Sequence, residues 1–178
     1  DIRGKAVFVR EDLNVPMKDG AVSDDTRLRA AMPTINELSD RGAKVLVLAH
    51  FGRPKGQVDM ACSLAPVVAP LSHVLGRPVS FMARPDPQAI AALPEGAVVV
   101  IENSRFAPGE EKNDPDMAKM LASFADMYVN DAFSAAHRAH VTTEGLALYL
   151  PAFAGRSMEK ELDAVSAALG SPVKPVAA

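Results

Sequence analysis

With 178 residues, the chain is long enough for one domain with its own hydrophobic core, and we expect it to form only one. The formal net charge of −3 at pH 7 argues against a protein that coats nucleic acid or an acidic membrane surface. No apolar run approaches the ~18 residues that a membrane-spanning helix needs, so we expect neither a membrane partner nor a nucleic-acid partner.

Cys62 is the single cysteine of the chain, which excludes an internal disulfide. That suits a reducing compartment, and we expect a cytoplasmic protein. The chain starts at Asp1 without a basic and then apolar leader, and residues 171–178 resemble a connection that leads into a further strand. We therefore expect this chain to be a piece of a longer protein.

The first half of the chain alternates predicted strands and helices. The first strand covers 6–10 (AVFVR), and a helix over 27–41 follows, because its apolar residues recur at helical spacing. Next come a strand over 44–49 (KVLVLA) and a helix over 63–75. Pro70 predicts a kink or an early end of this second helix, since a proline inside a helix costs about 3 kcal/mol.

The second half continues the alternation. A weaker strand covers 78–82 and a stronger one covers 97–101 (AVVVI). A helix over 115–125 follows, preceded by a capping aspartate and opened by a proline. A strand over 127–131 and a helix over 157–169 complete the series.

The strands are apolar throughout rather than alternating, which is typical of parallel strands covered on both faces. Strand–helix alternation at this spacing predicts an α/β fold, a three-layer, doubly wound parallel sheet of Rossmann-like type. The sequence has no internal repeat and no internal linker. The only candidate boundary follows Gly170, so residues 1–170 are expected to form one domain.

Ligands of doubly wound sheets bind beyond the carboxyl ends of the strands, so the residues that follow each strand are the candidates for a site. Four arginines and up to three histidines fall there or at the start of the first helix. Guanidinium groups match carboxylate and phosphate oxygens, and a cleft lined by one sign of charge concentrates its ligand. The pattern predicts a site for a small, multiply anionic molecule. The candidates are Asp12, Asn14, Arg27, His50, Gly52, Arg53, Arg105 and Arg138, with Glu102, Asn103, His137 and His140 beside them.

Other kinds of site lack their motifs. The sequence has no G-x-x-x-x-G-K-[ST] loop and no G-x-G-x-x-G after a strand, so it predicts no nucleotide cradle. No Cys/His set has the spacing of a zinc site, and the pair of His137 and His140 lacks a third ligand, so we expect no metal site. We expect Glu110 and Glu111 to be a solvated pair of charges. Gly52 fits either a ligand contact or a turn before Pro54.

Eight blocks follow one another along essentially the whole chain: 9–16 (VREDLNVP), 25–27 (DTR), 32–35 (MPTI), 48–54 (LAHFGRP), 102–106 (ENSRF), 109–111 (GEE), 129–140 (VNDAFSAAHRAH) and 154–162 (AGRSMEKEL). In this order they resemble the phosphoglycerate kinase family, and the number and order of the blocks make the signal specific. Glu11 and Ser104 depart from the family pattern, which more often has an apolar residue and a leucine there, and Ala49 stands where a small hydroxyl residue is common.

The resemblance implies a glycolytic enzyme that transfers a phosphoryl group reversibly between 1,3-bisphosphoglycerate and ADP, giving 3-phosphoglycerate and ATP. In that family the N-terminal domain holds the phosphoglycerate, and the C-terminal domain holds the Mg-ATP or Mg-ADP. Residues 1–170 would be the N-terminal domain, including the start of the interdomain helix at about 157–169. Residues 171–178 would be a truncated connection to the missing nucleotide domain. This chain alone would bind 3-phosphoglycerate but no nucleotide and no metal, and would not turn over. The full-length enzyme is expected to be a monomer.

The resemblance also implies individual roles. Asp12 and Asn14 would hold the carboxyl and hydroxyl end of the substrate, with Gly52 nearby. Arg27 would be the catalytic arginine, meeting the moving phosphoryl group when the domains close. The basic patch for the phosphate and carboxylate would consist of His50, Arg53, Arg105 and Arg138.

Two other functions stay open from the residues alone. A free-standing binding module for small phosphorylated acids would use the same basic edge without catalysing a reaction. An oxidoreductase on a similar sheet is disfavoured, because no glycine-rich turn follows any predicted strand.

Overall fold

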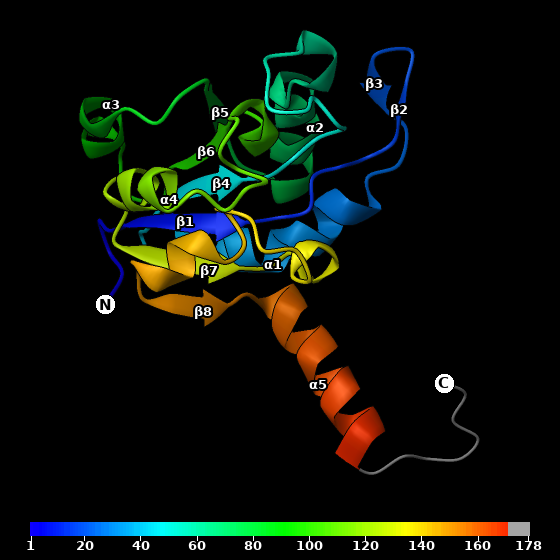
Figure 1. Cartoon of the computed structure of the whole chain (residues 1–178), viewed down its shortest axis with the longest axis vertical. Helices are drawn as coiled ribbons and strands as arrows, with labels where there is room; N and C mark the ends of the chain where they lie inside the picture. Colours follow the sequence, from blue (N-terminus) through cyan, green and yellow to red (C-terminus); the bar gives the residue numbers. More distant parts are fainter. Residues whose placement is uncertain (171–178) are drawn as a thin grey trace.

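The computed structural model describes residues 1–170, so the expected connection at 171–178 lies outside the described residues. Six strands form one sheet in the order β5-β6-β4-β1-β7-β8, and every pairing in it is parallel (Figure 1). A separate two-stranded antiparallel hairpin precedes the first helix. The strands are β1 (Ala6–Arg10), β2 (Met17–Lys18), β3 (Ala21–Val22), β4 (Lys44–Leu48), β5 (Val79–Met82), β6 (Val98–Ile101), β7 (Met127–Asn130) and β8 (Ala152–Ala154).

Helices cover both faces of the sheet, which confirms the predicted three-layer α/β class. Buried residues of the first two helices belong to one hydrophobic core, and those of the next two helices belong to another. The last helix projects away from the body of the molecule (Figure 1). The helices are α1 (Thr26–Asp40), α2 (Ala65–Leu75), α3 (Pro87–Ala92), α4 (Pro115–Ala122) and α5 (Arg156–Gly170), with 3-10 turns at Met60–Cys62, Ser104–Phe106, Phe133–Ala135 and Gly145–Leu148.

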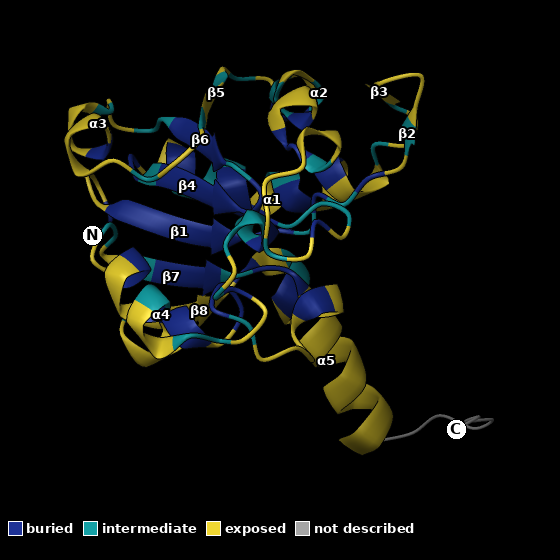
Figure 2. Cartoon of the chain, turned by 45° about the horizontal axis from the view of Figure 1, so that its top comes forward, coloured by how far each residue is buried: buried dark blue, intermediate teal, exposed yellow. Residues whose placement is uncertain are grey.

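The central strand β1 shows why the strands are apolar runs. All five of its residues are buried. Val7 and Val9 face the core under α1 and α2, whereas Ala6 and Phe8 face the core under α3 and α4. A strand covered on both faces buries every side chain, so no polar residue alternates with the apolar ones. Figure 2 shows the strands at the centre of the sheet as its buried layer.

The structure differs from the predicted elements at several points. Helix α2 continues past Pro70 to Leu75, so the expected early end is wrong, whereas the expected kink stays a prediction. Val67, Leu71 and Leu75 on this helix are buried in the core, and their burial outweighs the lost backbone hydrogen bond. Helix α4 ends at Ala122, three residues earlier than predicted. Helix α3, strand β8 and the hairpin of β2 and β3 were not predicted.

Helix α5 begins with caps that come from distant parts of the chain. Thr34 Oγ1 accepts a hydrogen bond from the Arg156 N–H at 2.8 Å. Asp131 Oδ1 accepts from the N–H groups of Ser157 and Met158, at 2.8 and 3.2 Å. These contacts satisfy three of the N–H groups that a helix start leaves without a partner. The helix starts one residue before the predicted position, and it is anchored both to α1 and to the end of β7.

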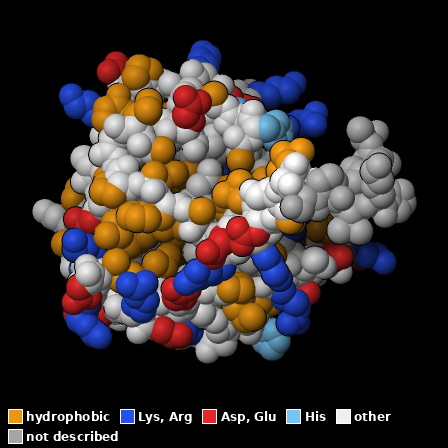
Figure 3. All heavy atoms as spheres, turned by 90° about the horizontal axis from the view of Figure 1, so that it is seen from below, with side chains coloured by type: hydrophobic (Ala, Val, Ile, Leu, Met, Phe, Trp, Pro, Cys, Tyr) orange, Lys and Arg blue, Asp and Glu red, His pale blue; other side chains and the backbone are white. Residues whose placement is uncertain are grey.

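Beyond this anchor, no other segment of residues 1–170 covers the helix. Every residue of α5 from 159 to 170 is exposed, including the apolar residues Leu162, Val165 and Leu169. Phe153 on β8 is exposed as well. Figure 3 views the molecule from below and shows apolar side chains among acidic and basic ones on this face. Within residues 1–170, no helix combines the length and the apolar character needed to cross a membrane.

Replacing Gly155 by alanine is expected to lower the stability of the chain by about 1–3 kcal/mol. An alanine Cβ at this position would collide with the Asp131 carboxylate. The carboxylate would have to move, and the first turn of α5 would lose its cap. Urea unfolding followed by circular dichroism measures the change.

The matched control is Gly170→Ala, at the far end of α5. No heavy atom of residues 1–170 lies within 4 Å of a Cβ built there, so stability is expected to stay unchanged or to rise slightly. Equal unfolding midpoints for Gly155→Ala and the unmodified chain would show that the Asp131 cap contributes nothing.

Candidate functional site

The site lies at the carboxyl edge of the sheet, next to the central strand. Strand β1 pairs with β4 on one side and β7 on the other, with Arg10 opposite both Leu48 and Asn130. The loops that leave these three strands therefore start side by side. The chain also changes its direction across the sheet at β1, and doubly wound sheets bind ligands at such a point.

The loop after β1 contributes Asp12 and Asn14, and α1 contributes Arg27. The Arg27 Nε lies 3.5 Å from Asp12 Oδ2, and its Nη1 donates to the Asn14 carbonyl oxygen. Ser134, on the loop after β7, donates to the same Asp12 oxygen at 2.7 Å. Arg27 borders two hollows, one of about 580 Å³ that it shares with Asn14 and one of about 230 Å³ that it shares with Asp12. The structure thus brings these three predicted residues together.

Gly52 makes the turn that holds the loop after β4. Its N–H donates to Asn14 Oδ1 at 3.1 Å, and its carbonyl oxygen accepts from Arg105 Nη1 at 3.3 Å. The residue has a φ of +60°, and a Cβ there would lie 2.8 Å from the Cys62 Sγ. Both facts require glycine, so the turn role of Gly52 is confirmed. Its predicted contact with a ligand stays a prediction.

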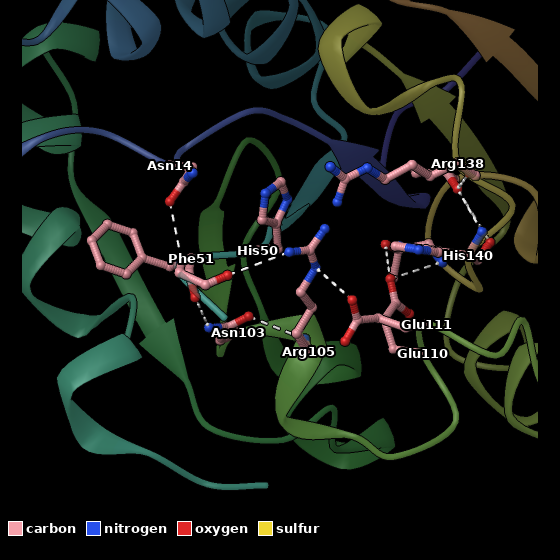
Figure 4. A network of polar contacts seen from close by, with 12 residues as sticks. Asn14, His50, Phe51, Asn103, Arg105, Glu110, Glu111, Arg138 and His140 are labelled. Carbon is pink, nitrogen blue, oxygen red and sulfur yellow. Dashed lines mark hydrogen bonds and ion pairs between the residues drawn. The ribbon is translucent and has the colours of Figure 1, made fainter. Parts of the chain in front are cut away.

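The basic residues gather beside this turn. Figure 4 shows the side chains of Arg105 and Arg138 extending toward His50, from below and from the right. The Arg105 side chain is 5% exposed and lies 3.7 Å from Glu111 Oε1. Burial lowers the pKa of Arg105, and the charges of Arg138 and Arg53 act in the same direction. Arg53 and Arg138 themselves are exposed, so two solvent-facing cations border a buried one.

Asn103 fixes the position of Arg105. Its Oδ1 accepts from the Arg105 N–H at 3.1 Å. Its Nδ2 donates to the carbonyl oxygens of Phe51 and Cys62, at 2.6 and 2.8 Å. Asn103 therefore ties the loop after β6 to the loop after β4, and it acts within the scaffold of the site.

His50 is half-buried and meets a buried arginine. The Arg10 Nη2 lies 2.9 Å from His50 Nδ1. Burial lowers the pKa of His50 to about 3, and the positive charges of Arg10, Arg105 and Arg138 add to this effect. His50 is therefore a neutral ring at physiological pH, although it stands among cations.

A buried polar chain behind His50 was missed in the sequence. Arg10 is 1% exposed, and its Nε donates to Thr142 Oγ1 at 3.0 Å. Thr142 Oγ1 donates in turn to Glu110 Oε1 at 2.5 Å. Glu110 is fully buried, so its expected place in a solvated pair is wrong, because Thr142 and the charge of Arg10 hold it inside. Glu111 is exposed. One signal in the sequence pointed to this buried polar chain, because Arg10 ends a strand that is otherwise apolar.

Glu11 is a second buried carboxyl group at this edge. It is 2% exposed, and it stands where the resembling family more often has an apolar residue. Burial raises its pKa well above the ordinary value, and the nearby Asp131 carboxyl group raises it further. Glu11 is therefore expected to carry a proton in the folded chain at pH values where a solvated glutamate would be ionised.

His137 and His140 flank Arg138 on the loop after β7. The Arg138 Nε lies 3.4 Å from His137 Nε2, and burial lowers the pKa of His140. Within residues 1–170, no group of three or more His, Cys, Asp or Glu side chains could hold a metal ion. The polar edge instead offers guanidinium and amide donors, which suit an anion.

The phosphoglycerate kinase family model matches residues 1–178. The chain is 66% identical over 179 residues to the phosphoglycerate kinase of Novosphingobium aromaticivorans, covering 100% of this chain and 45% of that protein. It is 62% identical to that of Zymomonas mobilis, covering 100% of this chain and 46% of that protein. The phosphoglycerate kinase structure from Coxiella burnetii superposes with a TM-score of 0.89 at 41% identity, covering 98% of this chain and 44% of that one. The chain spans less than half the length of these relatives.

Replacing Glu11 by glutamine is expected to change how stability depends on pH. The folded chain raises the pKa of Glu11, so the neutral carboxyl group stabilises the fold fully below the unfolded value of about 4.3. This contribution is lost as pH rises toward the folded pKa. Because the amide of Glu11→Gln is neutral at every pH, the unmodified chain should lose stability relative to the variant as pH rises above about 4.3. Urea unfolding at three pH values measures the difference.

The control is Glu161→Gln, an exposed position on α5. Its stability should follow that of the unmodified chain across the same range. A constant difference between the unmodified chain and Glu11→Gln would contradict a raised pKa at Glu11.

Proposed function

The chain belongs to the phosphoglycerate kinase family, and we propose that it is the part of such an enzyme that binds phosphoglycerate. The whole enzyme would transfer a phosphoryl group reversibly between 1,3-bisphosphoglycerate and ADP, giving 3-phosphoglycerate and ATP. The observation that carries this proposal is the cluster of His50, Arg53, Arg105 and Arg138 beside Asp12 and Asn14 at one edge of the sheet.

The proposed ligand matches the chemistry of this edge. 3-Phosphoglycerate carries a phosphate, a carboxylate and one hydroxyl group. Guanidinium forks form strong hydrogen bonds with the first two groups, and Arg105 is already held in place by its neighbours. Asp12 and Asn14 supply the acceptors for the hydroxyl group and help to hold the carboxyl end. The exposed Arg53 and Arg138 would close on the ligand from the solvent side.

Arg27 is proposed as the catalytic arginine. Phosphoryl transfer depends on in-line positioning and on neutralisation of the charge that spreads over the transferred group. The Arg27 side chain is 48% exposed and lies between the two hollows, so it can meet a phosphoryl group that arrives from outside this domain. Its contacts with Asp12 and the Asn14 carbonyl oxygen would orient it for that role.

The magnesium nucleotide does not fit the residues of this edge. A cluster of cationic side chains repels a divalent cation, and no glycine-rich phosphate loop occurs in the sequence. We propose that the nucleotide is held by the part of the longer relatives that this chain does not cover. Residues 1–170 would then be the N-terminal domain, and α5 would begin the interdomain helix. Its bare apolar face supports that placement. We also propose that the whole enzyme is monomeric and cytoplasmic.

Titration calorimetry of this chain is expected to show binding of 3-phosphoglycerate and no binding of magnesium-ATP. Arg138→Ala should weaken the binding of the acid by about 1.5–3 kcal/mol, or roughly 10- to 150-fold in Kd, since it removes one charge-assisted hydrogen bond. The side chain is exposed, so the variant should keep its fold.

The control is Arg3→Ala. Arg3 forms an ion pair with Glu95 at 3.0 Å near the other end of the strands, so its loss should leave the affinity unchanged. Binding of magnesium-ATP, or absence of acid binding in a folded chain, would refute the proposed role. Equal affinities for Arg138→Ala and the unmodified chain would remove Arg138 from the site.

Arg27→Ala is expected to lower kcat by about 10²–10³-fold, the usual effect of removing one group that stabilises transition-state charge. The assay requires a polypeptide with the full length of the relatives that carries this chain, supplied with 3-phosphoglycerate and magnesium-ATP. Arg29→Ala, on the same helix and paired with Asp25 at 2.9 Å, is the control and should keep its kcat. A change in KM for 3-phosphoglycerate alone would make Arg27 a binding residue instead.

A further inference from the structure

The contact between Arg10 and His50 allows only one arrangement of protons. Nη2 of Arg10 lies 2.9 Å from Nδ1 of His50 (the histidine is labelled in Figure 4). A guanidinium group has five donors and no acceptor, so Nδ1 must accept the hydrogen bond. The neutral imidazole ring then carries its single proton on Nε2.

Arg10 itself is held on all sides. Its Nε donates to Thr142 Oγ1 at 3.0 Å, and its Nη1 donates to the backbone carbonyl oxygen of Glu11. Because the Thr142 hydroxyl accepts from Arg10, its own proton points to Glu110 Oε1, at 2.5 Å. The directions of the bonds from Arg10 to Thr142 and to His50 are therefore determined by its guanidinium group, which can only donate. The guanidinium group cannot turn away from His50 without losing two other bonds.

The surrounding charges keep His50 neutral. Its ring faces the cations Arg10, Arg105 and Arg138 and one anion, Asp12. A second proton, placed on Nδ1, would break the contact with Arg10 and would make the ring a fourth positive charge beside these three arginines. The ring is only partly buried, which leaves it open to a ligand.

We infer that Arg10, supported by Thr142 and Glu110, is a positioning residue that fixes His50 in the Nε2–H tautomer. His50 then meets an anionic ligand as a neutral hydrogen-bond donor and contributes no charge of its own. The identity of that ligand rests on the proposed function, whereas the tautomer does not. Arg10 itself is buried behind His50 and does not need to contact the ligand.

Nitrogen NMR of the unmodified chain tests the tautomer directly. In a sample labelled with ¹⁵N-histidine, the His50 signals are assigned by their loss in His50→Gln. Between pH 5 and pH 8, Nε2 should show the shift of a protonated nitrogen and Nδ1 that of a bare one, with no change across the range. A proton on Nδ1, or a titration within this range, would overturn the inference.

Thr142→Val tests the support of Arg10. The substitution keeps the volume but removes the hydroxyl group that links Arg10 to Glu110, so the His50 signals should shift toward a mixture of both tautomers. Thr34→Val is the matched control, because Thr34 is also buried but caps α5 instead. Its His50 signals should stay those of the unmodified chain. Identical signals in Thr142→Val would show that Thr142 does not take part in fixing the tautomer.

Two substitutions of His50 test its donor, Nε2–H, separately from its acceptor, Nδ1. The amide nitrogen of glutamine can take the place of Nε2–H, whereas asparagine can replace only the acceptor that faces Arg10. His50→Asn should therefore bind 3-phosphoglycerate about tenfold more weakly than His50→Gln, the effect of one hydrogen bond to a charged group. Equal losses would overturn the donor role. If the unmodified chain bound no 3-phosphoglycerate, the proposed function would fail while the NMR result would still decide the tautomer.

Discussion

The buried positive charge of Arg10 organises the functional edge of this domain. The guanidinium group of Arg10 ends the central strand, and moving such a group out of water costs several kcal/mol unless it is paired and hydrogen-bonded. Burial lowers its pKa and the charge of Glu110 opposes that change, while three different segments supply its hydrogen-bond partners. The loops after β4 and β7 are thereby held against the end of β1, and Glu110 on the loop after β6 is linked to them through Thr142. An unpaired Arg10 would be costly, so these loops have little freedom to rearrange.

The fold class could be predicted because burial on both faces leaves a direct mark in the sequence. The strands at 6–10, 44–48 and 98–101 are runs of apolar residues, and the structure places them at the centre of the sheet. Elements at the margin leave a weaker mark. The three residues of β8 are all exposed, and α3 has six residues with one of them buried, so neither produced a pattern. Pro70 misled the prediction because local propensity ignores how much apolar surface the rest of α2 buries.

The clustering of candidate residues could be predicted where a residue follows a strand or opens a helix. Asp12, Arg27 and Arg138 follow strands or open a helix, and topology alone brings such positions to one edge. Glu110 was misjudged because its partners, Thr142 and Arg10, are 32 and 100 positions away in the chain. No local pattern reveals a pairing of that kind. The binding roles themselves follow from family resemblance and from chemistry, and they stay predictions until ligands are measured.

Helix α5 is anchored at its first turn, so a small rotation there moves its far end by a larger distance. Its 15 residues form a rod about 22 Å long, since each residue of an α-helix adds about 1.5 Å. The anchor consists of the two capping residues, Thr34 and Asp131. Asp131 stands three residues before Ser134, whose hydroxyl group donates to Asp12. A tilt of 5° at this anchor would move the far end by about 2 Å. Small shifts beside Asp12 are thus geometrically amplified at the opposite end of the rod.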